Sequence, residues 1–314
     1  MSHLRAIVIT APGINCDLEL VRAFEMAGAE PEVHLLKSLM RSPSTLDGAR
    51  LIGLPGGFSF GDDIAAGRIM AQLIRRSISP ALIAAIERGV PMICPCNGFQ
   101  IAVQAGLLPG GAAEHGAADR GAAERRVGVA GSDAPAHREA PAHRDAPTPT
   151  VALAQNTDGK FHDRWTEVEI PSNTRCIWTK GLSSHAERTL PNAHGEGRFV
   201  ASPEIAASLE ANGQIALRYA EADDFNGSLG RIAGICDPSG VVLGLMPHPE
   251  RFTRWTQHPR WTRLDASVRR GTPLGLAMFE NAVRFVRERG AGDSTRRGAR
   301  SAPAHSLLDR GLGS

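Results

Sequence analysis

The chain has 314 residues, of which 42% are hydrophobic and 22% charged, enough to bury one large core or two ordinary ones. Its 35 Lys and Arg residues nearly balance 33 Asp and Glu residues, and the net charge of +2 gives no bulk attraction to nucleic acid or to a membrane surface. No apolar run approaches the roughly 20 residues of a membrane span, and the first predicted strand begins so early that we expect no signal peptide. The five cysteines, an odd number without framework spacing, fit a reducing compartment, so we expect a cytoplasmic protein.

The first half of the chain alternates short apolar segments with amphipathic ones. Their periodicities predict strands at 6–10, 32–36, 51–54 and 90–93, and helices at 18–27, 64–76, 81–88 and 98–106. Because strands alternate with helices through short connections, we expect an α/β fold with a doubly wound, mostly parallel sheet flanked by helices. Such sheets place their functional sites at the carboxyl ends of the strands.

After residue 150 the pattern changes to strands in succession, followed by a closing helix. These additional strands are predicted at 165–170, 176–179, 214–219, 232–236 and 241–245, and the helix at 275–288. Two segments, 110–150 and 291–314, are rich in Ala, Gly, Pro and charge and contain few large apolar residues. Because they can bury too little surface to offset the entropy of ordering, the sequence predicts one domain at 1–290 with a disordered insertion at 110–150, followed by a disordered tail.

Cys96 lies between a predicted strand and a predicted helix, in the segment Cys94-Pro95-Cys96-Asn97-Gly98. A strand–turn–helix elbow exposes its central residue above the sheet and aims the following backbone N–H groups at the same point. The helix N-terminus also favours a thiolate over a thiol. The pattern indicates a cysteine nucleophile, although a cysteine after a buried strand is more often a small core residue.

His248 and Glu250 follow the predicted strand at 241–245. A nucleophilic cysteine needs a base that takes up its proton, and the base needs an acceptor that orients it. A histidine and a carboxylate two residues apart, just past a strand end, can supply both. The alternative for His248 is a loop histidine held by backbone contacts, and its combination with the segment around Cys96 weighs against that alternative.

A third segment, Pro55-Gly56-Gly57, follows the predicted strand at 51–54. Two glycines allow the backbone to turn tightly and to approach a ligand closely. One of their N–H groups could therefore bind the oxyanion of an acyl-transfer reaction. By itself the segment is equally consistent with an ordinary turn.

Six stretches of the chain, in order, resemble the motifs of one enzyme family. They are residues 11–17, 55–62, 96–100, 193–198, 226–228 and 245–251, which read APGINCD, PGGFSFGD, CNGFQ, AHGEGR, NGS and LMPHPER. The chain thus resembles the class I glutamine amidotransferases and, more narrowly, the glutaminase subunits of phosphoribosylformylglycinamidine synthases of purine biosynthesis. It departs from the family at Cys94 and Pro95, where the family has a glycine followed, in most members, by a small aliphatic residue.

The resemblance implies roles for individual residues. Cys96 is the expected nucleophile, His248 the general acid and base, and Glu250 the residue that orients His248. The expected oxyanion- and substrate-binding residues are Gly57, Phe58, Asn97 and Gln100, and the expected partner or site loops contain His194, Glu196 and Asn226. Gln100 could instead be a solvent-facing helix residue, and His194 and Glu196 could lie in a purely structural loop.

The resemblance also implies a flavodoxin-like sheet and a second protein. Glutaminases of this kind supply ammonia to a synthetase subunit, sometimes with a small accessory subunit, which converts phosphoribosylformylglycinamide to phosphoribosylformylglycinamidine. We expect ATP and Mg²⁺ on the synthetase, because this chain has no Gly-rich phosphate loop ending in Lys-Ser or Lys-Thr. For this chain we expect glutamine as substrate, no cofactor, no metal, and no nucleic-acid or membrane partner. The alternatives are a glutaminase that serves another synthetase, a cysteine hydrolase of similar fold, and a non-catalytic interaction subunit.

Overall fold

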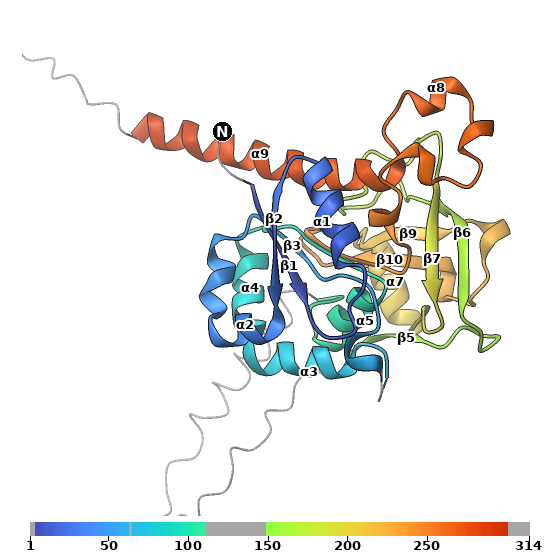
Figure 1. Cartoon of the computed structure of the whole chain (residues 1–314), viewed down its shortest axis with the longest axis horizontal. Coiled ribbons are helices and arrows are strands. Elements are labelled where there is room, and N and C mark those ends of the chain that lie inside the picture. Colours follow the sequence, from blue (N-terminus) through green and yellow to red (C-terminus); the bar gives the residue numbers. More distant parts are fainter. Residues whose placement is uncertain (1–3, 63–64, 111–148, 301–314) are drawn as a thin grey trace, which may run out of the picture.

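The computed structural model describes residues 4–62, 65–110 and 149–300, with residues 291–300 described by their backbone alone. Its strands are β1 Arg5–Thr10, β2 Glu30–Leu35, β3 Leu51–Gly53, β4 Met92–Pro95, β5 Val151–Ala154, β6 His162–Glu169, β7 Thr189–His194, β8 Arg198–Ala201, β9 Ile215–Tyr219, β10 Ile232–Cys236 and β11 Val242–Leu245. A nine-stranded sheet has the order β2-β1-β3-β4-β11-β10-β9-β6-β7, and β5 pairs with β8 in a separate small sheet (Figure 1).

The large sheet has a parallel part and an antiparallel part. Strands β1 to β4 and β11 run parallel to their neighbours in that part, whereas β10, β9, β6 and β7 are added in antiparallel pairs. Strands β1, β4 and β11 are almost entirely buried, as expected for parallel strands that are covered on both faces. Four of the five additional strands that the sequence predicts, those at 165–170, 214–219, 232–236 and 241–245, therefore belong to the same sheet.

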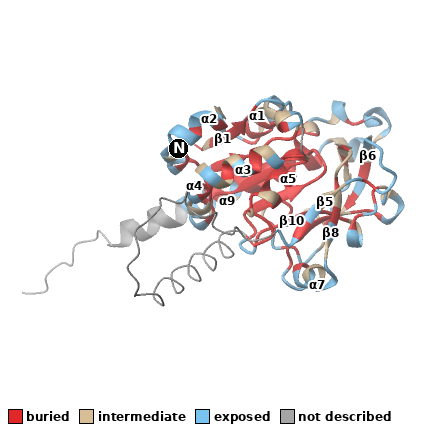
Figure 2. Ribbon diagram, turned by 90° about the horizontal axis from the view of Figure 1, so that it is seen from below, coloured by how far each residue is buried: buried red, intermediate tan, exposed pale blue. Residues whose placement is uncertain are grey.

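Helices cover both faces of the large sheet (Figures 1 and 2). On one face α1 and α9 pack together through Phe24 and Phe279, whose rings meet edge to face at 5.3 Å. On the other face α2, α3, α4 and α5 bury side chains such as Leu39, Ile74 and Phe99. The helices are α1 Asp17–Met26, α2 Leu36–Arg41, α3 Arg68–Ser77, α4 Ser79–Glu87, α5 Asn97–Gln104, α7 Pro203–Ala211, α8 Ala266–Arg269 and α9 Leu274–Arg300.

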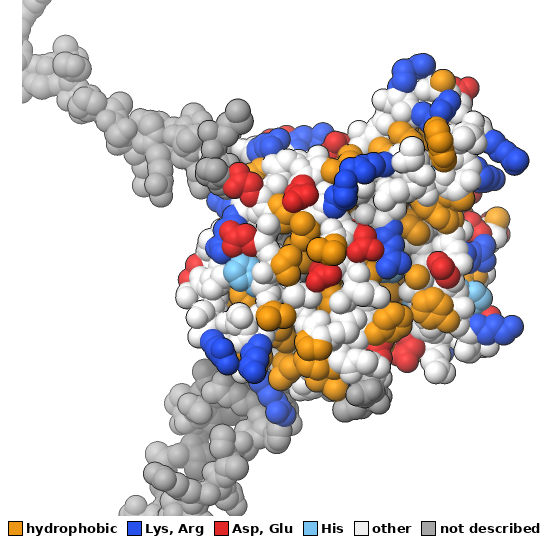
Figure 3. Space-filling view, in the orientation of Figure 1, with side chains coloured by type: hydrophobic (Ala, Val, Ile, Leu, Met, Phe, Trp, Pro, Cys, Tyr) orange, Lys and Arg blue, Asp and Glu red, His pale blue; other side chains and the backbone are white. Residues whose placement is uncertain are grey.

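No single helix in the described ranges is long and apolar enough to span a membrane. Helices α3 and α4 reach that length and apolarity only as a pair, and the pair is bent by 78°. On the face shown in Figure 3, Lys and Arg side chains are scattered among acidic and apolar ones and form no continuous stripe.

The predicted α/β fold is confirmed, with most elements close to their predicted positions. The helix predicted at 64–76 begins only at Arg68, because Gly67 has a φ of 74° and so lies outside the helical region. Helix α9 continues to Arg300, so the first part of the predicted disordered tail has a helical backbone. Residues 111–148 and 301–314 lie outside the described residues, and the disorder expected there stays a prediction.

The strand predicted at 176–179 is wrong, because these residues form consecutive turns. The apolar residues Cys176 and Trp178 of this segment are fully buried in the core. The indole nitrogen of Trp178 donates to Val241 O at 2.9 Å. The Trp178 carbonyl accepts from Asn281 of α9 at 3.0 Å. Core burial thus explains the sequence pattern without strand pairing.

Candidate active site

Cys96 occupies the turn between β4 and α5, at the carboxyl end of a central strand. Its backbone has a φ of 49° and a ψ of −109°, a conformation that costs a non-glycine residue on the order of 1–3 kcal/mol. Hydrogen bonds hold this conformation: the Cys96 N–H donates to Leu245 O at 2.7 Å, and the Cys96 carbonyl accepts from the N–H groups of Phe99 and Gln100 at 2.9 and 3.2 Å. The arrangement is a strand–turn–helix elbow of the kind that presents a nucleophile.

The elbow forms with Cys94 and Pro95 in place of the family's glycine and small residue. Cys94 is fully buried in β4, and burial raises the pKa of its thiol, so Cys94 is an inert core residue. Gly98 carries the close approach of α5 to the sheet, because a Cβ at this position would lie 2.0 Å from the carbonyl oxygen of Leu54. The position that must lack a side chain for the elbow to pack is therefore located after Cys96, at Gly98, in this chain.

His248 and Glu250 follow β11, which pairs in parallel with β4, so both residues reach the edge of the sheet where Cys96 lies. The Nδ1 atom of His248 lies 2.7 Å from Oε1 of Glu250, and both side chains are buried. The Nε2 atom of His248 has no hydrogen-bond partner among the described residues, which leaves it available to exchange a proton. Burial by itself lowers the pKa of His248, but the negative charges of Glu250 and of the Cys96 sulfur raise it well above its ordinary value.

The loop after β3 brings Gly56 and Gly57 against these side chains. A Cβ on Gly56 would lie 2.9 Å from Cε1 of His248 and 3.4 Å from Cβ of Cys96, so both side chains pack against this glycine. Gly57 adopts a φ of 139° and lines the same cavity as Cys96. Asn97 is the first residue of α5, so its N–H has no acceptor within the helix. The two predicted oxyanion donors, Gly57 and Asn97, therefore both flank Cys96.

A cavity of about 160 Å³ opens onto Cys96 and contains most of the predicted site residues. Gln100 is buried, and its amide donates to Glu196 O at 2.5 Å and accepts from Nδ2 of Asn97 at 2.9 Å, so the solvent-facing alternative for Gln100 is wrong. Phe58 is 47% exposed at the rim of the cavity. The lining residues are Gly57, Phe58, Asp62, Ala66, Cys96, Gln100, Phe161, Ala193, His194, Gly195 and Glu196.

His194 and Glu196 belong to the wall opposite α5. His194 ends β7, and Glu196 lies in the turn that leads to β8. Burial, together with the nearby charge of His248, lowers the pKa of His194 to about 3, so its ring is neutral at physiological pH. The preceding carbonyl, of Ala193, accepts from the Cys96 thiol at 3.5 Å. The Gly-rich segment therefore contributes directly to the cavity that contains Cys96.

Asn226 contacts this wall and is completely buried. Its Nδ2 donates to Gly197 O at 3.1 Å, and its Oδ1 accepts from the Ser228 N–H at 3.1 Å. Its side chain therefore holds the turn around Glu196 in place and does not reach the surface, where a partner protein would bind.

Three further residues at the site receive no role from the sequence. Asp62 lines the cavity, accepts from Nδ2 of Asn97 at 3.4 Å, and has its pKa raised by burial. Phe161 also lines the cavity and stacks on Phe58 with ring centroids 6.4 Å apart. Cys16 lies beside His248 and accepts from Arg251 at 3.0 Å. Asp62 and Cys16 fall within the motifs at 55–62 and 11–17, so a signal was present, whereas nothing in the sequence marks Phe161.

Cys16 also completes a group of potential metal ligands. A sulfur atom of Cys16, a ring nitrogen of His248 and a carboxylate oxygen of Glu250 lie within 4.8 Å of one another. Because His248 and Glu250 already bind each other, a metal here would compete with their pairing. The expectation that this chain holds no metal stays a prediction.

Comparisons with known proteins agree with this geometry. The chain matches the family model of the CobB/CobQ-like glutamine amidotransferase domain over residues 3–125 and 135–286. It is 33% identical to the phosphoribosylformylglycinamidine synthase subunit PurQ of Dehalococcoides mccartyi, over 92% of this chain and 100% of that protein. With the PurQ subunit of Corynebacterium jeikeium it shares 37% identity over 88% of this chain and 95% of that protein.

A solved structure gives the same assignment. The structure of PurLQS from Thermotoga maritima contains a chain that superposes with a TM-score of 0.59 and 30% sequence identity, covering 91% of this chain and 100% of that one. The buried thiol–imidazole–carboxylate arrangement at the strand ends is thus found in a chain that is related to PurQ along almost its full length. This chain belongs to the PurQ family of phosphoribosylformylglycinamidine synthase subunits, within the CobB/CobQ-like glutamine amidotransferase domains.

Proposed function

We propose that this protein is the glutaminase subunit of a phosphoribosylformylglycinamidine synthase, with Cys96, His248 and Glu250 as its catalytic triad. One observation carries the proposal: Cys96, on an elbow with positive φ, meets the His248–Glu250 pair around Gly56. A buried structural cysteine does not need the strained backbone of Cys96. A loop histidine held by backbone contacts does not need a buried Nε2 atom without a hydrogen-bond partner among the described residues. Membership of the PurQ family supports the choice of reaction.

The chemistry begins with the side-chain amide of glutamine in the 160 Å³ cavity. The Cys96 thiol gives its proton to Nε2 of His248, the sulfur attacks the amide carbon, and the oxygen that becomes negative is bound by the N–H groups of Gly57 and Asn97. Nε2 of His248 gives a proton to the departing nitrogen, which leaves as ammonia, and the carbonyl carbon stays on Cys96 as a thioester. A water molecule then gives a proton to Nε2 and attacks the thioester. The C–S bond breaks to release glutamate, and Nε2 returns the proton to the Cys96 sulfur.

Asp62, Glu196 and Gln100 line the same cavity as Cys96. The negative charge of the two carboxylates suits the α-ammonium group of an amino acid. Gln100 is held by Glu196 O and by Asn97, so its amide is fixed in direction before substrate arrives. We infer that these groups select free glutamine over other amides.

The ammonia is expected to pass to a synthetase subunit that converts phosphoribosylformylglycinamide to phosphoribosylformylglycinamidine. Relatives of the chain are named as subunits of that synthase, and one related structure is of PurLQS. We infer that ATP and Mg²⁺ act on the synthetase, that a small accessory subunit can take part, and that the complex works in the cytoplasm. The five cysteines, all free and buried, support a reducing compartment.

The test is a comparison of nitrogen sources in the reconstituted complex. Cys96→Ser should abolish synthesis with glutamine and leave synthesis with added ammonia intact, because only the glutaminase step needs the thiol. Cys94→Ala is the matched control, since it removes the neighbouring thiol from the core, and it should retain both activities. Glutamine-dependent synthesis that survives in Cys96→Ser, or that is lost in a folded Cys94→Ala, would contradict the assignment.

A further inference from the structure

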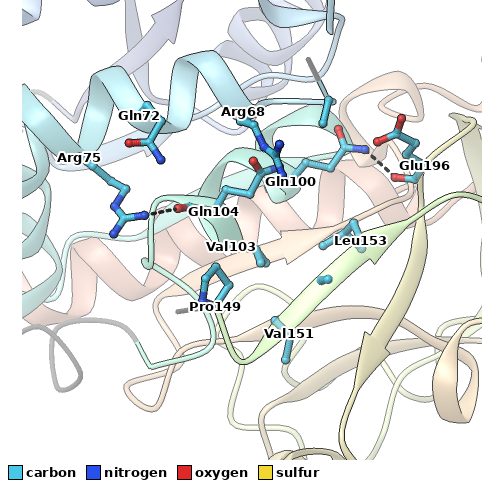
Figure 4. Close-up of a pocket in the computed structure, with 12 residues that line it drawn as sticks. Arg68, Gln72, Arg75, Gln100, Val103, Gln104, Pro149, Val151, Leu153 and Glu196 are labelled. Carbon is cyan, nitrogen blue, oxygen red and sulfur yellow. Dashed lines mark hydrogen bonds between the residues drawn. The ribbon is translucent and has the colours of Figure 1, made fainter. Parts of the chain in front are cut away.

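A second cavity, of about 650 Å³, lies between α3, α5 and β5 (Figure 4). It is separate from the smaller cavity at Cys96 but shares two residues with it, Gln100 and Glu196. The proposed glutaminase reaction uses none of the residues on its other walls. Its volume falls in the middle of the range of about 300–1,000 Å³ that is typical of small-molecule sites.

One wall of this cavity is cationic and comes from a single face of α3. Arg68, Gln72 and Arg75 are spaced four and three residues apart, and Figure 4 shows Arg68 and Arg75 reaching from the helix toward the cavity. The Arg68 guanidinium has no hydrogen-bond or ion-pair partner in the part of the chain that the structure describes. Arg75 donates to Gln104 O at 3.5 Å and has no acidic partner in the same ranges. Both arginines therefore retain donors for an anionic ligand.

The opposite wall is aliphatic and has amides at its edge. Val103 of α5 and Val151 and Leu153 of β5 form an apolar surface that faces the arginines (Figure 4). Gln104 donates to Ala66 O at 2.7 Å, which fixes its amide and leaves its side-chain oxygen as an acceptor. An apolar plate beside a fixed amide suits a flat heterocycle that carries N–H groups.

We propose that this second cavity binds a nucleoside monophosphate, with the phosphate on Arg68 and Arg75 and the base against Val103, Val151 and Leu153. Guanidinium groups bind phosphate through charge-assisted, often bidentate hydrogen bonds. An inorganic anion would use the arginines but not the aliphatic wall, and an uncharged nucleoside would use the wall but not the arginines. The ligand class follows from both walls together.

Binding in this cavity is connected to the catalytic cavity by a short chain of hydrogen bonds. Gln100 lines both cavities and accepts from Nδ2 of Asn97 at 2.9 Å, and Oδ1 of Asn97 accepts from the Ser59 N–H at 3.2 Å. Ser59 belongs to the loop that carries Gly57. An occupant that shifts Gln100 therefore also shifts the loop with an oxyanion donor, and by linkage glutamine and the nucleotide change each other's affinity by the same factor.

The experiment is isothermal titration calorimetry of the full chain with AMP, IMP and GMP, and with adenosine and inorganic phosphate as partial ligands. At least one nucleotide should bind, and each partial ligand should bind at least about tenfold more weakly than that nucleotide. No binding of any nucleotide, or binding of inorganic phosphate as tight as that of the nucleotide, overturns the proposal. The measurement involves no glutaminase turnover, so its result is separate from the test of the catalytic triad.

Matched variants locate the site. Arg68→Ala combined with Arg75→Ala should weaken nucleotide binding about tenfold or more, since each lost charged hydrogen bond is costly. Arg41→Ala combined with Arg76→Ala removes the same charge, from α2 and from α3 itself, at residues that do not line the cavity, and this variant should bind as the wild type does. Arg68→Glu provides a single change at an exposed residue, which leaves the fold intact and should also weaken binding. Equal affinities in the lining and control pairs overturn the proposal.

Discussion

Cys96 shows how a single residue can be held in an unfavourable conformation by its neighbours. Its left-handed φ of 49° is fixed by the hydrogen bond to Leu245 O on one side and by the start of α5 on the other. Gly98 lets the helix approach within contact of the Leu54 carbonyl. Because these contacts come from β11, from α5 and from Leu54 directly after β3, the position of the thiol is set by three separate segments, and Pro95 can replace the usual small residue.

The side chains of Cys96 and His248 both pack against Gly56. We therefore expect Gly56→Ala to lower the catalytic rate more than it lowers the stability of the fold. The new methyl group would lie 2.9 Å from His248 and 3.3 Å from the Cys16 sulfur, and these side chains would have to move. A displacement of about 1 Å can lower a rate about a hundredfold. We expect the kcat for glutamine to fall by that order, with a small change in melting temperature.

Gly271→Ala is the control for this variant. An added Cβ at Gly271 would have its nearest neighbour 3.4 Å away, and Gly271 does not line the cavity that contains Cys96. It should retain the wild-type kcat. If Gly56→Ala keeps full activity, the packing of the thiol and imidazole around this glycine is not a catalytic requirement.

The His248–Glu250 pair should make stability depend on pH in a defined direction. Because the pKa of His248 is raised in the folded protein, its protonation adds stability that is fully present below the unfolded value of about 6.5 and is lost as the pH rises through the folded value. Glu250→Gln removes the largest charge behind this shift. We expect the wild type to melt at least about 2 °C above Glu250→Gln at pH 6, with a gap that narrows as the pH rises.

Thermal melts at several pH values measure this gap, and Glu288→Gln supplies the control. Glu288 is exposed on α9, so its loss should shift the melting temperature little at any pH. A gap between wild type and Glu250→Gln that stays constant from pH 6 to the highest pH tested would refute charge pairing at His248.

At the scale of elements, the turn between β7 and β8 depends on one buried amide. Asn226→Ala removes two buried hydrogen bonds, to Gly197 O and from the Ser228 N–H. We expect a loss of about 1–3 kcal/mol in the free energy of unfolding and a higher KM for glutamine, because Glu196 lies in the turn and lines the cavity. Denaturant unfolding and steady-state kinetics measure the two effects.

Asn212→Ala is the matched control, since Asn212 bonds only to Ser208 on the surface of α7 and lies away from the cavity. It should leave the KM unchanged. A folded Asn226→Ala with an unaltered KM would show that the turn is positioned without this amide.

The elements that the sequence predicts well are those with local signals. The buried strands and amphipathic helices before Cys96 follow from apolar periodicity, and the placement of Cys96, His248 and Glu250 at one edge of the sheet follows from motifs at strand ends. The sequence does not predict strand β7, because its Pro191 cannot donate a backbone hydrogen bond and so argues against a strand. The proline is tolerated in the structure because β7 is an edge strand of the large sheet. Phe161 and the lining of the second cavity depend on segments that meet only in three dimensions.

For the whole molecule, two exposed aromatic rings at the mouth of the catalytic cavity point to control by a partner. Phe58 and Phe161 are 47% and 53% exposed and stack on each other, and Phe58 directly follows Gly57, the proposed oxyanion donor. A synthetase that covers this pair would also order the glycine loop. We expect the isolated chain to be a poor glutaminase whose rate rises about a hundredfold when the synthetase and its substrates are added.

The measurement is glutamate release by the isolated chain and then by the complex. A synthetase preparation without its substrates serves as the control that separates docking from turnover. Equal rates of glutamate release in all three conditions would exclude partner control while leaving the glutaminase assignment in place.

The position of β11 has a consequence for how the protein is made. This strand comes late in the chain, yet it lies in the middle of the large sheet, between β4 and β10. The ribosome therefore synthesises the elbow with Cys96 long before it synthesises His248, which lies beside it in the folded protein. With the proposed triad, a nascent chain therefore carries the thiol without its base until β11 has been made. We expect glutamine to be split only after this central strand has been inserted into the sheet.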